Sequence, residues 1–227
     1  NYGAADFQRK RKGWLSEMSD FIWNMLRRVW QAGAAANDRL FRRGCDFSRW
    51  ATQEELGFAK SAGNQYQPSD GGLKKLLKRF HITPEDAIID IGCGKGKAMY
   101  LMSRVPFGRI AGYDLSEQLA ETANENFQKL GLTGCRAFQG DAAVFDGYDE
   151  YNYIYMFNAV PEEVFIRAIG HILDSVRRRP RVCVFIYLNP VYDRYLQEET
   201  PFRLIGEQNH PIPWFRYRWY QVGPLNR

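Results

Sequence analysis

The chain has 227 residues and a formal net charge of +5 at pH 7, and 45% of its residues are hydrophobic. That length is enough for one domain with an appendage and a sizeable core. No run reaches the roughly 18 apolar residues of a membrane-spanning helix. No secretory signal is recognisable. The chain begins at Asn1 rather than at Met, as expected of a sequence that has been trimmed. The four cysteines form no C-x-x-C pair and the three histidines are far apart. This argues against a disulfide framework or a metal site and favours free thiols in a reducing, cytoplasmic compartment.

The basic character lies in the first 50 residues, which hold ten Lys or Arg and five Asp or Glu, whereas the remainder is neutral. From Trp14 to Trp30 the apolar residues have the spacing of an amphipathic helix, and a second helix is expected from about Ala34 to Arg43. We therefore divide the chain into a basic amphipathic helical arm or cap, 1–50, and a body, 51–227. Packing of the apolar stripe on the body is the favoured interpretation. A basic helix with tryptophans also fits an anionic membrane surface, and a basic arm also fits nucleic acid.

A polar, irregular stretch from 50 to 69 precedes a short basic helix expected from Gly71 to Phe80. A turn at 83–86 then leads into an unbroken apolar run, Ala87 to Ile89, that ends in Asp90. Such a run is typical of a strand buried on both faces of a parallel sheet.

Glycines follow at positions 92, 94 and 96, before a helix expected from Lys97 to Val105. Glycine allows a sharp turn and a close approach of the backbone to a ligand, because it has no Cβ. The start of a helix also offers backbone N–H groups to a ligand. The order strand, carboxylate, glycine turn and helix therefore predicts a nucleotide-type binding corner.

The spacing of the glycines narrows the choice of ligand. The pattern D-x-G-x-G-x-G differs from the dinucleotide fingerprint G-x-G-x-x-G and from the phosphate loop G-x-x-x-x-G-K-[ST]. A carboxylate at the strand end would repel a pyrophosphate, but it would attract an ammonium group or ribose hydroxyls. The segment DIGCGKG, residues 90–96, resembles the first motif of the class I S-adenosylmethionine-dependent methyltransferases. A glycine-rich turn in another α/β protein is the alternative.

Two further acids follow predicted strands. The second strand, 109–113, ends in Asp114, which lies twenty residues after the second glycine of the turn. That interval places an acid on ribose hydroxyls in nucleotide-binding α/β units. The third strand, 136–139, is followed by Gly-Asp-Ala with Asp141 and Ala142. In the family that the chain resembles, an acid here reaches the adenine amino group and the next backbone N–H meets the ring.

The remaining elements complete a sheet with helices on both sides. We expect helices at 116–130, 161–178 and up to residue 199, and strands at 151–157, 182–188, 202–207 and 215–222. The resemblance covers residues 66–222 and implies an α/β fold: a Rossmann-like, doubly wound, seven-stranded sheet of the class I methyltransferase type with its last strand antiparallel. The N-terminal helical arm lies outside it.

The resemblance also implies the site. Asn158 follows the fourth strand, at the edge where open α/β sheets bind ligands, and it is expected beside the sulfonium and the acceptor; a residue that merely caps the turn is the alternative. The following Ala-Val-Pro departs from the family's Asn-Pro-Pro-aromatic pattern. Tyr66 is the expected lid residue facing the acceptor, and it is with Asn158 a candidate catalytic residue; a partly buried loop tyrosine is the alternative. The cofactor-binding residues expected are Asp90, Gly92, Cys93, Gly94 and Gly96 for the methionine part, Asp114 and Leu115 for the ribose, Asp141 and Ala142 for the adenine, and Asn158 beside the methyl group.

Together these features predict an S-adenosylmethionine-dependent methyltransferase that uses no metal. Such enzymes mainly orient the donor and the acceptor, so they need no identifiable base. The asparagine and the many aromatic residues favour a nitrogen acceptor, such as a lysine or a small-molecule amine, and an oxygen acceptor on a small molecule is the nearest alternative. The other hypotheses are an RNA methyltransferase that uses the basic arm, and a cofactor-binding partner protein without transferase activity.

Overall fold

The computed structural model describes residues 29, 32, 33, 36, 38, 42–57, 59, 62–69, 72–210 and 215–224. The basic tail and nearly all of the helix expected from Trp14 to Trp30 lie outside the described residues, as does part of the helix expected from Ala34 to Arg43. Membrane and nucleic-acid contacts through this arm therefore stay predictions. Within the described part of the chain, no helix is long and apolar enough to cross a membrane.

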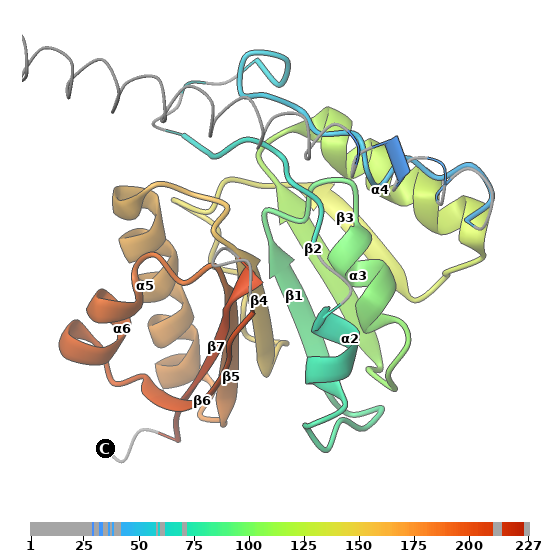
Figure 1. The fold of residues 1–227 in the computed structure, drawn as a ribbon. Helices are drawn as coiled ribbons and strands as arrows, with labels where there is room; N and C mark the ends of the chain where they lie inside the picture. Colours follow the sequence, from blue (N-terminus) through green and yellow to red (C-terminus); the bar gives the residue numbers. More distant parts are fainter. Residues whose placement is uncertain are drawn as a thin grey trace, which may run out of the picture.

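A seven-stranded sheet with the order β3-β2-β1-β4-β5-β7-β6 organises the described residues (Figure 1). The first five strands pair in parallel, whereas β7 is antiparallel to both β5 and β6. The strands are β1 (Ala87–Ile91), β2 (Arg109–Asp114), β3 (Cys135–Gln139), β4 (Tyr153–Phe157), β5 (Cys183–Leu188), β6 (Arg203–Gln208) and β7 (Tyr217–Val222). This topology confirms the predicted class I methyltransferase sheet, including its antiparallel last strand.

Helices cover both faces of the sheet (Figure 1). They are α2 (Gly72–Leu77), α3 (Lys97–Met102), α4 (Glu117–Leu130), α5 (Glu162–Arg178) and α6 (Asp193–Glu199). One hydrophobic core contains Phe165 of α5 and Leu196 of α6, and the other contains Leu73 of α2, Met99 of α3 and Phe127 of α4. Because both faces are covered, β1 and β5 are buried along their whole lengths, as their unbroken apolar runs predict.

Local capping sets the ends of the helices. The helix α4 begins after Ser116, whose Oγ accepts a hydrogen bond from the Leu119 N–H at 3.3 Å, and it ends at Gly131 with a φ of 68°. Both ends confirm the prediction. The helix α3 ends at Met102, three residues earlier than predicted. After Met102 the N–H groups of Arg104 and Val105 donate to carbonyls three residues back, and Pro106 disfavours the helical backbone at Val105.

The described residues before α2 pass over the carboxyl ends of the central strands (Figure 1). We call residues 42–57 and 62–69 the cap. The first part of the cap folds around Asp38, whose carboxylate accepts hydrogen bonds from the Phe47 N–H at 3.2 Å and the Ser48 hydroxyl at 2.5 Å. The cap therefore includes residues on both sides of the boundary that composition predicts near residue 50.

Candidate functional site

A cavity of about 360 Å³ lies where the cap meets the carboxyl ends of the strands. Its walls combine the cap, the glycine turn and the residues that follow β2, β3 and β4. Seven residues expected at the site line this cavity: Tyr66, Gly92, Asp114, Leu115, Asp141, Ala142 and Asn158. A smaller adjoining pocket also contains Tyr66 and Gly92 and adds Asp90 and Cys93. Gly94 and Gly96 line neither of the two.

The three glycines of the turn have left-handed backbones, with φ values of 70° at Gly92, 53° at Gly94 and 80° at Gly96. A Cβ at Gly92 would overlap Ala159 after β4, and a Cβ at Gly94 would overlap a ring in the cap. A Cβ at Gly96 would lie 2.5 Å from Phe127 of α4. The first two glycines therefore let the walls of the cavity approach the turn, whereas Gly96 allows α4 to pack.

Asp114 is held in place at the end of β2 by the main chain. Its Oδ2 accepts a hydrogen bond from the Gly94 N–H and its Oδ1 accepts one from the Ser116 N–H, both at 2.9 Å. Burial raises the pKa of Asp114 to about 6, and the two N–H groups oppose this rise. Each carboxylate oxygen keeps a further lone pair, so Asp114 can also accept hydrogen bonds from the hydroxyl groups of a ligand in the cavity.

Asp90, in β1 just before the turn, has only 2% of its surface exposed. Burial raises its pKa well above the ordinary value, and the charge of Asp114 adds to the rise. A cationic group close by would reverse this shift, because an opposite charge stabilises the ionised carboxylate. Two buried carboxyl groups beside a turn with three glycines therefore fit S-adenosylmethionine, which carries a sulfonium, an ammonium group and a ribose.

The remaining expected cofactor residues lie on the same side of the sheet. Asp141 follows β3, and its Oδ1 accepts a hydrogen bond from the Ala143 N–H at 2.8 Å, next to the buried Ala142. The thiol of Cys93 is buried, and burial raises its pKa well above the ordinary value. All four cysteines are free thiols, as predicted. Among the described residues, no group of three or more His, Cys, Asp or Glu side chains could hold a metal ion.

Asn158, directly after β4, has a left-handed backbone with a φ of 37°. Its Oδ1 accepts a hydrogen bond from the buried Tyr187 hydroxyl at 3.4 Å. Its carbonyl oxygen accepts a second one from the Nδ2 of Asn64 in the cap at 2.6 Å. Asn64 could not be identified from the sequence, because the two asparagines are 94 residues apart and belong to no shared motif.

Tyr66 covers the glycine turn from the cap. Its ring lies against Gly94, and its N–H donates to the carbonyl of Ala51 at 2.9 Å in an antiparallel bridge. Its hydroxyl donates to the carbonyl of Phe47 at 2.6 Å. Because this hydroxyl is bound within the cap, the geometry favours the expected covering role of Tyr66 over a catalytic role.

Sequence reasoning also missed the residues that dock the cap on the turn. Asn126 of α4 is fully buried; its Oδ1 accepts from the Asp46 N–H at 2.9 Å, and its Nδ2 donates to the carbonyls of Asp46 at 3.2 Å and Lys95 at 3.0 Å. The Lys95 ammonium group pairs with the Asp46 carboxylate at 2.5 Å. An asparagine inside an amphipathic helix gives no signal of such contacts, because the partners lie 31 and 80 residues away.

Comparison with known proteins agrees with this geometry. Residues 88–179 match the family model of a methyltransferase domain. Phosphoethanolamine N-methyltransferase 1 of Arabidopsis thaliana is 28% identical over 113 residues, which are 48% of this chain and 22% of that protein. The probable cobalt-precorrin-6B C(15)-methyltransferase (decarboxylating) of Methanococcus maripaludis is 29% identical over 81 residues, which are 35% of this chain and 44% of that protein. The matched part of this chain therefore spans less than half the length of each of these relatives.

Among solved structures, the ribosomal protein L11 methylase of Lactobacillus delbrueckii subsp. bulgaricus has a TM-score of 0.52 and 15% identity. The match covers 66% of this chain and 76% of that one. At this identity the likeness concerns the fold, and it agrees with the strand order described above. Residues 88–179 therefore match a methyltransferase domain, and the described residues have the class I methyltransferase fold.

Proposed function

We propose that the protein binds S-adenosylmethionine in the cavity under the cap and transfers its methyl group to a nitrogen, such as that of a lysine or a small-molecule amine. The observation that carries this proposal is the convergence of the glycine turn, Asp114, Asp141 and Asn158 on one cavity at the carboxyl ends of the strands. That edge of an open α/β sheet is where such folds bind their ligands.

When bound, S-adenosylmethionine supplies an activated methyl group, so the chain's own residues have to bind, orient and exclude water. Asp90 and the backbone of residues 92–96 would hold the cationic methionine part. Asp114 with Leu115 would hold the ribose, because an ionised carboxylate can accept both ribose hydroxyls. The carboxylate of Asp141 would accept from the adenine amino group, next to Ala142.

The acceptor end of the site centres on Asn158. Its Oδ1 already accepts one hydrogen bond from Tyr187, and the second lone pair of that oxygen can accept an N–H of an amine. This would orient the nitrogen while leaving its lone pair for attack on the methyl group. The Arabidopsis relative is named as an N-methyltransferase, which supports the same class of acceptor.

The test is an incubation of the full chain with methyl-labelled S-adenosylmethionine and fractions of a cell extract that contain proteins, RNA or small molecules. The proposal expects label in a protein or small-molecule fraction, on a nitrogen identified by mass spectrometry. An oxygen-linked or RNA-linked methyl group would refute the nitrogen assignment. The absence of transfer to every fraction, with the cofactor bound, would refute the transferase itself.

A further inference from the structure

Two sets of contacts tie the cap to the body at the cavity. In the first, the Tyr66 ring lies against Gly94 of the glycine turn. In the second, the main-chain N–H of Asn64 donates to the carbonyl of Ala159 at 2.9 Å, and its Nδ2 donates to the carbonyl of Asn158 at 2.6 Å. Both cap residues also line the cavity. The cap segment 62–67 therefore contacts both the expected cofactor loop and the expected acceptor end.

The contacts of Asn64 act on a residue whose backbone is unusual. Asn158 has a φ of 37°, which is an uncommon conformation for a residue with a side chain and one that persists where neighbouring contacts impose it. Asn64 donates hydrogen bonds to the carbonyl groups of Asn158 and of the next residue, Ala159. Ala159 in turn lies against Gly92. The Tyr187 hydroxyl independently holds the Oδ1 of Asn158. The main chain of Asn158 is thus held by the cap, and its side chain by β5.

The geometry points to Asn64 as a positioning residue that couples closure of the cap over the cofactor to the orientation of Asn158 toward the acceptor. The inference rests on the proposed function, because it takes the cavity as the cofactor site. Closing the cap forms the Asn64 hydrogen bonds, and these fix the turn that presents Asn158. Lifting the cap breaks the same bonds, so release of the cofactor and loss of the acceptor geometry are one event.

This coupling has two measurable consequences. A ligand under residues 62–67 leaves when that segment lifts, so loss of the Nδ2 donor should speed its dissociation. Loss of this partly buried hydrogen bond corresponds to about a two- to ten-fold change in rate. In addition, Asn158 should be less well oriented, so the rate of methyl transfer at saturating cofactor should fall by about ten-fold.

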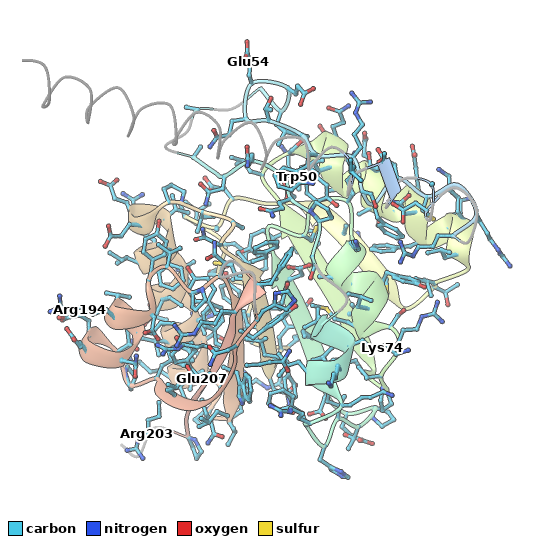
Figure 2. The ribbon with its side chains drawn as sticks, viewed as in Figure 1. Trp50, Glu54, Lys74, Arg194, Arg203 and Glu207 are labelled. Carbon is cyan, nitrogen blue, oxygen red and sulfur yellow. The ribbon has the colours of Figure 1, made fainter. Side chains whose placement is uncertain are left out.

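The experiment measures dissociation of S-adenosylhomocysteine from the immobilised full chain by surface plasmon resonance. Asn64→Ala removes the side-chain donor, and Asn64→Asp keeps the size but replaces the donor with a carboxylate. Asn64→Gln restores an amide donor and should recover a slower dissociation. Glu54→Ala is the matched control, because Glu54 lies exposed at the outer tip of the same cap (Figure 2). Melting temperatures without ligand establish that each variant is folded.

The inference expects faster dissociation and slower transfer of label for Asn64→Ala and Asn64→Asp, with Glu54→Ala unchanged. Wild-type dissociation rates in both Asn64 variants would overturn it, with the proposed function intact. Faster dissociation without any loss of transfer at saturating cofactor would also overturn it, because the cap would then close without positioning Asn158. If the wild-type chain bound no S-adenosylhomocysteine, the proposed function would fail instead.

Discussion

Replacing Asn126 by alanine should detach the cap from the glycine turn and destabilise the protein. The side chain is fully buried and makes three hydrogen bonds, two with the main chain of Asp46 and one with the carbonyl of Lys95. A buried polar group left without a partner costs about 1–3 kcal/mol. Asp46 is partly exposed and can recruit water, so we expect a total loss of about 2–4 kcal/mol.

Urea unfolding followed by circular dichroism measures this loss, with Glu125→Ala as the matched control. Glu125 precedes Asn126 on α4 but is exposed, so its replacement should change the free energy of unfolding by no more than about 0.5 kcal/mol. Limited proteolysis should also cleave the cap of Asn126→Ala sooner than that of the control. If Asn126→Ala were as stable as Glu125→Ala, the cap would not be docked in the way described.

Two further predictions concern the site. Asp114 has a pKa of about 6 in the folded chain, against an ordinary value of 3.8. The folded state therefore binds its proton more readily, and this group should add about 2 kcal/mol of stability as the pH falls from 7 to 4. Urea unfolding at both pH values should show that Asp114→Asn lacks this gain; an unchanged pH dependence would contradict the burial of the carboxyl group. Gly94→Ala should destabilise the chain by more than Gly131→Ala in thermal unfolding. Both glycines have a positive φ, but only a Cβ at Gly94 meets a ring, that of Tyr66, whereas the space at Gly131 is open. We expect about 1 kcal/mol for Gly131→Ala and at least about 2 kcal/mol for Gly94→Ala; equal losses would refute the contact with Tyr66.

The positions of most strands and helices were predictable from short-range patterns, whereas their arrangement in one sheet was expected from the resemblance to the family. The apolar run that becomes β1 is unbroken because both faces of that strand are covered, and Ser116 and Gly131 mark the ends of α4 through their own hydrogen bonds and backbone conformation. The early end of α3 was not predicted, since the apolar spacing continues to Val105, three residues past the last residue of the helix. Patterns of spacing thus locate the elements better than their ends.

Some residues of the candidate site could likewise be predicted from the sequence, and others could not. Asp90, Asp114 and Asp141 follow or end predicted strands, so the parallel sheet brings them to one edge without further information. Asn64 contacts a residue that lies 94 positions away in the sequence, and Asn126 contacts one that lies 80 positions away. Such contacts exist only once the chain is folded, and polar residues in a loop or on a helix carry no signal of them. Tyr66 could therefore be expected to cover the site, but the contacts that hold the cap in place could not be predicted.

Calorimetric titration with S-adenosylhomocysteine tests the central claim, that the carboxyl edge of the sheet under the cap is a cofactor site. We predict one binding site per wild-type chain and an affinity at least about ten-fold lower for Asp114→Ala, because the ribose loses its carboxylate partner. Equal affinities for the two chains would contradict the ribose assignment. Binding of ADP in preference to S-adenosylhomocysteine would contradict the cofactor site as a whole.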